Sequence, residues 1–140
     1  MSANVKHLTS IVVLNYNAGD LLLNCIESVY KTQTHKFEVI VVDNISTDSS
    51  HKKCKEKFPQ IRLIENKENL GYCEGNNVGI RNANGEFIVI LNPDTKVESN
   101  WLEELFNAYE KFGDGLYQPK IIAFEDNLFE SGGNMLQMFG

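Results

Sequence analysis

The sequence EFIVILNPDT, residues 86–95, indicates a strand that leads directly into a polar turn. Its apolar run, residues 87–91, is rich in β-branched side chains, which is typical of a strand covered on both faces in a parallel sheet. Pro93 fixes its own backbone and keeps Asn92 extended, so Asn92 and Asp94 leave the strand end at a defined angle. Ligands of open α/β sheets bind at the carboxyl ends of strands, but Asn, Pro and Asp also form ordinary turns. The stretch alone leaves both interpretations open.

Apolar runs elsewhere predict four more strands. They lie at residues 10–14, 37–42, 61–64 and, more weakly, 116–124. Pro119 interrupts the last of these, which should therefore lie near a sheet edge. The first two strands end, like the strand at 87–91, in polar residues that run from Asn15 to Gly19 and from Asp43 to Asp48.

Helical segments separate these strands. Asp20 is placed to cap a helix whose apolar stripe reaches Tyr30, and a second helix begins near Ser99 and ends at Gly113. Residues 49–58 form a polar helix with few apolar anchors, which we expect on the outside. The alternation of strands and helices predicts an α/β fold, a Rossmann-like and mostly parallel sheet flanked by helices on both faces.

Gly71, Gly75 and Gly79 recur every four residues and share one face of another predicted helix. Each glycine costs about 1 kcal/mol relative to alanine inside a helix, so a face without side chains needs a reason. Close packing on the sheet is the preferred explanation for Gly79. For Gly75, packing and the close approach of a ligand remain equal alternatives.

The composition limits the class of protein. The 140 residues are 42% hydrophobic and carry a net charge of −6, which fits one globular domain and disfavours a general nucleic-acid surface. No apolar stretch is long enough to cross a bilayer, and residues 1–9 lack the apolar middle of a signal peptide, so we expect a cytoplasmic protein. Peripheral membrane association and a homo-oligomer remain open.

Cysteine and histidine give no catalytic or metal-binding pattern. Cys25, Cys54 and Cys73 have no metal-ligand spacing, and we interpret them as free thiols that fill helix faces. The histidines lie in polar loops or on the polar helix, and we interpret all three as solvated: His7, His35 and His51.

The turn from Asn15 to Gly19 lacks both the Gly-x-Gly-x-x-Gly pattern of dinucleotide sites and a phosphate-binding loop. Asp43 and Asp94 both follow predicted strands and should lie on the same side of the sheet. An acidic site that binds a diphosphate requires a divalent cation as intermediary. The residues alone therefore indicate a metal-dependent site for an anionic ligand.

Four motifs in order resemble the nucleotide-sugar half of family 2 glycosyltransferases, and the rhamnosyltransferase-like subgroup in particular. They are VLNYN at 13–17, VVDN at 41–44 with Ser46 and Asp48, NLG through NNVGI at 69–80, and LNPD at 91–94. The resemblance implies a GT-A fold and a UDP- or dTDP-sugar donor. It also implies a divalent metal, Mg²⁺ or Mn²⁺, and inverting transfer to a glycan or lipid-linked acceptor.

The resemblance also assigns roles to residues. Tyr16 would lie against the pyrimidine, Asp43 would read its edge, and Asp94 would hold the metal and the diphosphate. Asn92 stands where many relatives carry Asp, so the metal should be held less tightly. The remaining residues implied in nucleotide-sugar binding are Asn15, Asn17, Asn44, Gly71, Gly75 and Asn76.

No catalytic base is identified. The resemblance places the base and the acceptor-binding segment after residue 140, so residues 1–140 are predicted to form a single GT-A domain truncated on its acceptor side. Within the chain the candidate bases are Glu125, Asp126 and Glu130, and the apolar residues 132–140 are expected to seek a partner. Two other functions remain as alternatives, a nucleotidyltransferase acting on sugar phosphates and a non-catalytic nucleotide- or partner-binding domain.

Overall fold

The computed structural model of the protein describes residues 7–32, 35–123 and 129–131. The chain forms two compact units, Met1–Trp101 and Leu102–Gly140. No helix in the described ranges has the length and apolar character that a bilayer-spanning segment needs.

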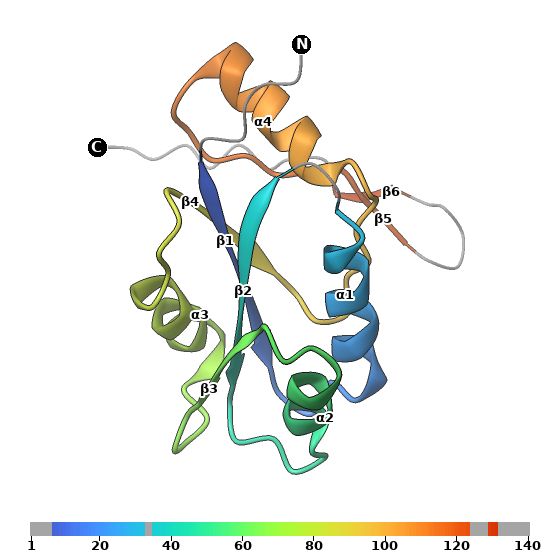
Figure 1. Ribbon diagram of the computed structural model, residues 1–140, viewed down its shortest axis with the longest axis vertical. Coiled ribbons are helices and arrows are strands. Elements are labelled where there is room, and N and C mark those ends of the chain that lie inside the picture. The colour runs from blue at the N-terminus through green and yellow to red at the C-terminus, as the bar shows by residue number, and fades with distance from the viewer. Residues whose placement is uncertain (1–6, 33–34, 124–128, 132–140) are drawn as a thin grey trace. The chain divides into compact units, whose positions relative to one another are not determined.

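The first unit is built on a parallel sheet of four strands, as the sequence predicted (Figure 1). The strands are β1 (Leu8–Asn15), β2 (Lys36–Asp43), β3 (Arg62–Glu65) and β4 (Phe87–Leu91), in the order β3-β2-β1-β4. The two central strands supply half of the buried hydrophobic residues among those described, because their apolar runs are covered on both faces. The fully buried side chains of these strands include Ile11, Val12, Val13, Ile40, Val41 and Val42.

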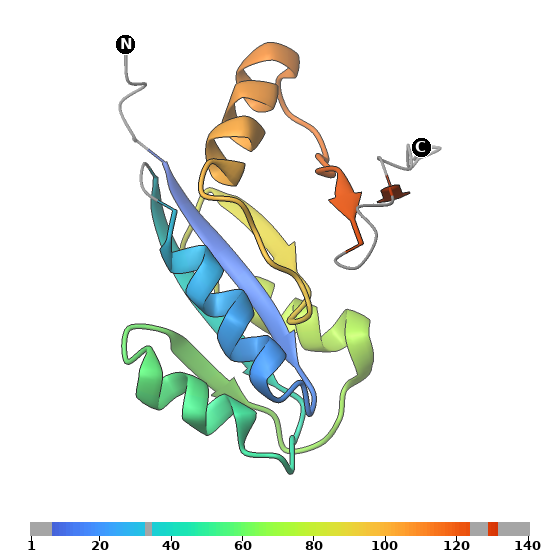
Figure 2. The same cartoon turned by 90° about the vertical axis from the view of Figure 1, so that its right-hand side faces the viewer.

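Helices cover both faces of the sheet. The helices α1 (Asp20–Tyr30) and α2 (Ser50–Lys57) pack together on one face, and α3 (Gly71–Arg81) packs on β1 and β2 from the other (Figures 1 and 2). The prediction that Asp20 caps α1 is wrong: Gly19 takes the cap position, with no side-chain cap, and Asp20 is the first helical residue. Because Gly19 has φ +57°, glycine suits this position.

The glycine face of α3 lies directly on the sheet. A Cβ added at Gly79 would lie 2.3 Å from Val12 Cγ1, and one added at Gly75 would lie 2.5 Å from Leu14 Cδ1. The packing explanation for Gly79 is therefore confirmed, and the structure favours the same explanation for Gly75. The missing side chains bring α3 close to the ends of β1 and β2, where the polar residues lie.

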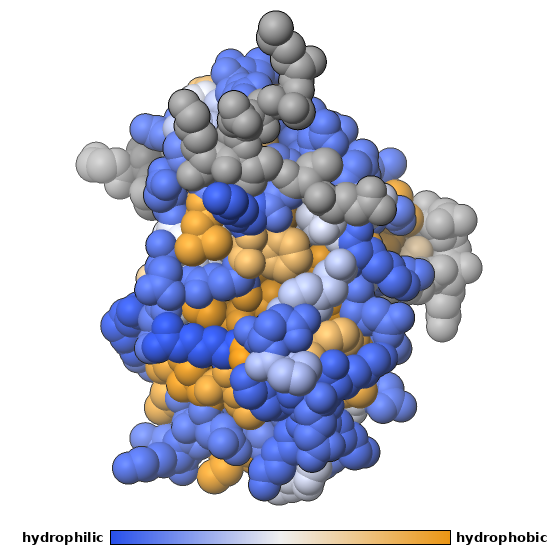
Figure 3. Space-filling view, viewed as in Figure 1, coloured by the Kyte–Doolittle hydropathy of each residue, from blue (hydrophilic) through white to orange (hydrophobic). Residues whose placement is uncertain are grey.

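The strand β4 occupies the sheet edge and pairs only with β1 among the described strands. Ile88 and Ile90 on this strand are 42% and 46% exposed, so the prediction that it is covered on both faces is wrong. The opposite edge is also incomplete, because β3 pairs with only the last four residues of β2. Figure 3 shows apolar surface between polar regions in the middle of the face that it presents.

The second unit begins within α4 (Trp101–Phe112). Gly113, with φ +80°, donates its backbone N–H to Tyr109 and ends the helix, as predicted. The fifth strand expected over residues 116–124 is much shorter: within the described residues 116–123 the strand is β5 (Ile121–Ile122), and it pairs antiparallel with β6 (Phe129–Ser131) in a separate sheet. The apolar stripe of α4 leaves Phe112 69% exposed.

The cysteines are free thiols, as predicted. Cys25 and Cys54 are buried in helices α1 and α2, and burial raises the pKa of Cys25 to about 12 and that of Cys54 to about 11. Both thiols are therefore protonated at neutral pH. Cys73 is exposed, so the expectation that it fills a helix face is wrong.

Candidate functional site

Two polar residues end the central strands and are buried there. Asn15 and Asp43 are register partners on β1 and β2, with 0% and 2% of their surface exposed. Asn15 Nδ2 lies 2.8 Å from Asp43 Oδ1, and it also lies 3.0 Å from Ser46 Oγ and 2.9 Å from Ser50 Oγ. Because buried polar groups need partners, this contact fixes both strand ends relative to the loop after β2.

The loop from Asp43 to Ser50 is held by its own carboxylates. Asp43 Oδ2 accepts a hydrogen bond from the Ser46 amide at 2.9 Å. Asp48 accepts from the Ser50 amide and hydroxyl, at 2.9 and 2.7 Å, and from the Gly19 amide at 2.9 Å. Burial opposes the ionisation of Asp48, but these hydrogen bonds and the charge of His51 outweigh it and lower its pKa. The loop is thus tied to the start of α1.

Asn17 connects the loop after β1 to the loop after β2. Its side-chain oxygen accepts hydrogen bonds from the amides of Thr47 and Asp48, at 2.7 and 3.2 Å, and its own amide donates to Ser46 Oγ at 2.9 Å. Asn17 has φ +51°, a conformation that asparagine tolerates better than most residues. The neighbouring Tyr16 is 55% exposed, so its ring remains accessible beside a rigid pair of loops.

Asn44 extends the network to α3. Its Nδ2 donates to the Gly71 carbonyl at 3.1 Å, and its Oδ1 accepts from Asn66 Nδ2 at 2.8 Å. One turn further along α3, Asn76 is 3% exposed and donates to the Tyr72 carbonyl, while its Oδ1 has no hydrogen-bond partner among the described residues. The predicted residues Asn44, Gly71, Gly75 and Asn76 therefore lie together at the strand ends.

The turn after β4 forms a second, exposed polar group. Asn92 and Asp94 are both exposed, and Asn92 Oδ1 accepts a hydrogen bond from the Tyr72 hydroxyl at 3.2 Å. The helix α1 contacts the turn at two points. Cys25 Sγ lies 3.6 Å from the Asn92 carbonyl, and Ser28 Oγ accepts a hydrogen bond from the Val97 amide at 3.1 Å. Asp94 thus lies on a turn held by α1 and is exposed to solvent.

The first polar group lies at the ends of β1 and β2, and the second follows β4, which pairs with β1. Strands lie about 4.8 Å apart, so the ends of β2 and β4, two strands apart, are about 10 Å apart across the sheet. Within the described ranges no cluster of three or more His, Cys, Asp or Glu side chains could hold a metal ion on its own. The arrangement suits an extended ligand that spans both groups.

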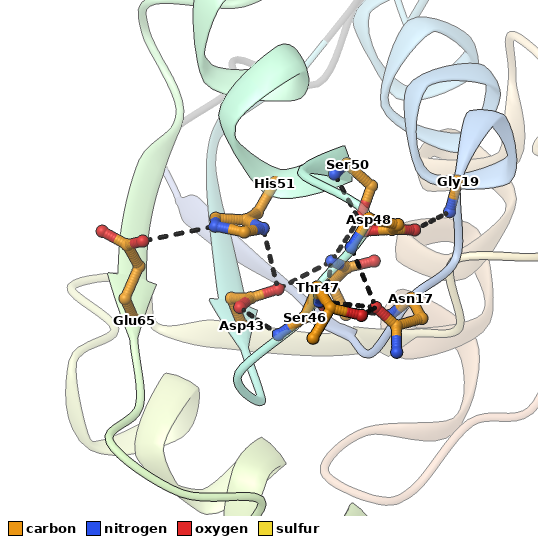
Figure 4. Close-up of polar contacts among 10 residues, drawn as sticks. Asn17, Gly19, Asp43, Ser46, Thr47, Asp48, Ser50, His51 and Glu65 are labelled. Carbon is orange, nitrogen blue, oxygen red and sulfur yellow. Dashed lines mark hydrogen bonds and ion pairs between the residues drawn. The ribbon is translucent and has the colours of Figure 1, made fainter.

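His51 also belongs to the buried network, which the sequence interpretation missed. It is 4% exposed, with Nδ1 3.4 Å from Asp43 Oδ1 and Nε2 3.3 Å from Glu65 Oε1 (Figure 4). The expectation that it is solvated is wrong because the first turn of α2 faces the strand ends. The signal in the sequence was the acidic residue at the end of each of two predicted neighbouring strands, Asp43 and Glu65, because two adjacent carboxylates favour a cationic partner.

Comparison with known proteins gives the family. The family model described as "Glycosyl transferase family 2" matches residues 10–138. The chain belongs to glycosyltransferase family 2. Among its relatives, glycosyltransferase GlyG of Streptococcus pneumoniae serotype 4 is 34% identical over 134 residues, which cover 93% of this chain and 43% of the relative.

Solved structures of glycosyltransferases share the fold. A mannosyltransferase from Pyrobaculum calidifontis, solved in complex with GDP-Man and Mn²⁺, superposes with a TM-score of 0.68 at 25% identity, over 76% of this chain and 33% of the other. TarS of S. aureus, in a fragment of residues 1–349 solved with UDP-GlcNAc, gives a TM-score of 0.67 at 21% identity, over 81% and 40% of the two chains. The GT-A fold expected from the sequence is confirmed.

The family 2 chain described here spans less than half the length of these relatives. The candidate bases Glu125 and Asp126 lie outside the described residues, and for Glu130 the structure describes only the backbone, in β6. The apolar residues 132–140 also lie outside the described ranges.

Proposed function

We propose that this chain is the donor-binding part of a longer glycosyltransferase, formed as one GT-A domain that continues beyond residue 140. It binds a UDP- or dTDP-sugar through Mg²⁺ or Mn²⁺, and the complete enzyme transfers the sugar with inversion to a glycan or lipid-linked acceptor. The motif pattern favours a rhamnosyltransferase-like enzyme. The buried, protonated thiols of Cys25 and Cys54 fit a reducing compartment, and we place the protein in the cytosol.

The observation that carries this proposal is the pair of polar groups, one at the ends of β1 and β2 and the other after β4. The group at the end of β2 is buried and rigid and has the exposed ring of Tyr16 beside it, which suits the stacking of a nucleobase. The group after β4 presents the exposed carboxylate of Asp94, where a diphosphate would lie. The mannosyltransferase solved with GDP-Man and Mn²⁺ supports the combination of nucleotide sugar and metal.

The residues after β4 fit a divalent metal held mainly by its substrate. Mg²⁺ binds proteins through one or two carboxylates together with waters and substrate phosphates, so one exposed carboxylate at Asp94 is sufficient. Asn92 Oδ1 accepts one hydrogen bond from Tyr72 and is neutral, so the ionisable carboxylate of Asp94 is proposed as the main protein ligand. The metal, when bound, neutralises charge on the diphosphate leaving group.

Asp43 is proposed to read the base. A carboxylate has about four acceptor sites, and the Ser46 amide and Asn15 Nδ2 each occupy one, so capacity remains for the N3–H donor of uracil or thymine. Cytosine presents a bare acceptor at N3 and would face the carboxylate without a hydrogen. The same contacts that hold the loop also fix the position of the Asp43 carboxylate.

A thermal-shift panel tests the proposal. Ligand that binds only the folded state raises apparent stability, so UDP or dTDP with Mn²⁺ should raise the Tm, and CDP or GDP should raise it less. The inert comparison is ATP with Mn²⁺, which controls for non-specific phosphate binding. If no nucleoside diphosphate changed the Tm, with or without metal, the result would favour the alternative that the chain is a non-catalytic domain.

A further inference from the structure

His51 is buried between two carboxylates on neighbouring strands. Asp43 and Glu65 are register partners at the ends of β2 and β3, and the imidazole ring lies between them, at 3.4 and 3.3 Å (Figure 4). Asp43 has 3% of its side chain exposed and Glu65 has 57%. Two like charges side by side repel each other, and a cation between them removes that repulsion.

The hydrogen-bonding capacity of histidine depends on its charge. A neutral imidazole donates from one nitrogen only, whereas an imidazolium donates from both. His51 Nδ1 is buried and forms no hydrogen bond with a described residue, although it lies at ion-pair distance from Asp43. Only the protonated ring can therefore serve both carboxylates, and the neutral ring must present a lone pair to one of them.

Three carboxylates face the ring from different segments. They are Asp43 from β2, Glu65 from β3, and Asp48 from the loop before α2, whose pKa the charge of His51 helps to lower. Without a positive ring, this side of the site would present only negative charge to an anionic donor. A protonated His51 reduces that charge beside the proposed base-binding residue.

We infer that His51 is a positioning residue, which holds the Asp43 carboxylate toward the nucleobase when its ring is protonated and so makes donor binding depend on pH. The inference rests on the proposed function, because it deepens the base-reading role of Asp43. Asn15 and the Ser46 amide hold Asp43 from two sides, and His51 holds it from the third. Glu65 stabilises the protonated ring from the solvent side.

The test is the affinity of a UDP-sugar, measured by calorimetry with Mn²⁺ across the range, about pH 5 to 8, in which histidine changes charge. A UDP-sugar is used because its diphosphate diester does not titrate there, unlike UDP. The wild-type chain should bind about three- to tenfold more tightly at the acidic end of that range, while His51→Gln should show little pH dependence. Glu65→Gln, which alters a half-exposed side chain, should move the pH midpoint of binding downward.

The matched control is His7→Gln, because His7 is a half-exposed histidine at the opposite end of β1 and should leave the pH profile unchanged. Equal pH dependence in the wild type, His51→Gln and Glu65→Gln would overturn the inference while leaving UDP-sugar binding intact. Absence of binding by the wild type at every pH would instead contradict the proposed function. In that case, NMR titration of the His51 ring in the wild type and in Glu65→Gln still tests the coupling between the charges of His51 and Glu65. The inference requires this coupling, and identical titration curves in the two proteins would exclude it.

Discussion

Asp43 is proposed both to hold the loop after β2 and to recognise the nucleobase, and one substitution can separate these two roles. Asp43→Asn keeps one acceptor oxygen but cannot accept from both Asn15 and the Ser46 amide, so we expect a loss of about 1–3 kcal/mol in unfolding free energy. We also expect the preference for UDP over CDP to narrow, because the amide can donate to cytosine N3.

Urea unfolding measures the first effect and competition calorimetry the second. The control is Asp114→Asn, an exposed carboxylate in the second unit that should change neither quantity. If Asp43→Asn lost stability but kept the full preference for UDP over CDP, Asp43 would have a structural role only.

Sequence reasoning about single residues succeeded where the signal was local. The Asn and Asp residues after the strands were found because polar residues follow apolar runs without a spacer, and the structure brings Asn15, Asp43 and Asn44 together. His51 was missed because the polarity of residues 49–58 does not say which side of a short helix faces the sheet. That orientation depends on Asp43 and Glu65, which lie on separate strands.

The packing of α3 on the sheet is decided by its glycines. Gly79→Ala would gain about 1 kcal/mol in helix propensity but would place a methyl group 2.3 Å from Val12 Cγ1, in the core of the sheet. Overpacking of this kind costs about 1–3 kcal/mol, so a net loss of unfolding free energy is expected in urea titrations. Gly115→Ala, whose nearest neighbour would lie at 3.9 Å, is the matched control and should be nearly neutral. If Gly79→Ala left the unfolding free energy unchanged, this result would contradict the close approach of α3 to β1.

The amino ends of the strands are joined by Glu38 on β2. Burial opposes its ionisation, but hydrogen bonds from the Ser10 hydroxyl, at 2.5 Å, and from the amide and side chain of Asn84, at 2.7 and 3.0 Å, lower its pKa from the ordinary 4.5. A lowered folded-state pKa adds stability above the unfolded value, which is lost as the pH falls through the folded value.

Acid titration of the unfolding free energy tests this connection. Below about pH 4.5 the wild type should lose stability more steeply than Glu38→Gln, which lacks the titrating group. Glu103→Gln, an exposed position on α4, should follow the wild type. Parallel acid slopes for the wild type and Glu38→Gln would show that the carboxylate does not support the fold.

The order of strands and helices along the chain could be predicted because apolar β-branched runs and glycine spacing are local features of the sequence. The exposure of β4 could not, since it depends on which strands become neighbours, and the sequence of residues 87–91 is that of a covered strand. The same limit explains the fifth strand: Pro119 was recognised as an interruption, but the antiparallel pairing of Ile121 with Ser131 involves a distant segment.

The whole chain is predicted to bind donor without efficient transfer. Inverting displacement needs a base on the acceptor side of the anomeric carbon, and Asp43 and Asp94 are assigned to the nucleotide and diphosphate. The chain covers 43% of GlyG, which leaves room in the relative for an acceptor-binding part. Turnover of a labelled donor with a mixed panel of glycan acceptors should be negligible. Robust transfer by these 140 residues would place the base within the chain, at Glu125, Asp126 or Glu130.

The metal dependence of donor binding at Asp94 decides whether this chain holds its donor through a divalent cation. Calorimetric titration of UDP into the wild type should give measurable affinity with Mn²⁺ and at least about tenfold weaker affinity in excess chelator, because the exposed carboxylate and the diphosphate share the ion. Asp94→Asn should bind UDP weakly with or without Mn²⁺, while Asp114→Asn should behave as the wild type. Equal affinity with and without metal, or normal binding by Asp94→Asn, would contradict the account and leave residues 92–95 as an ordinary turn.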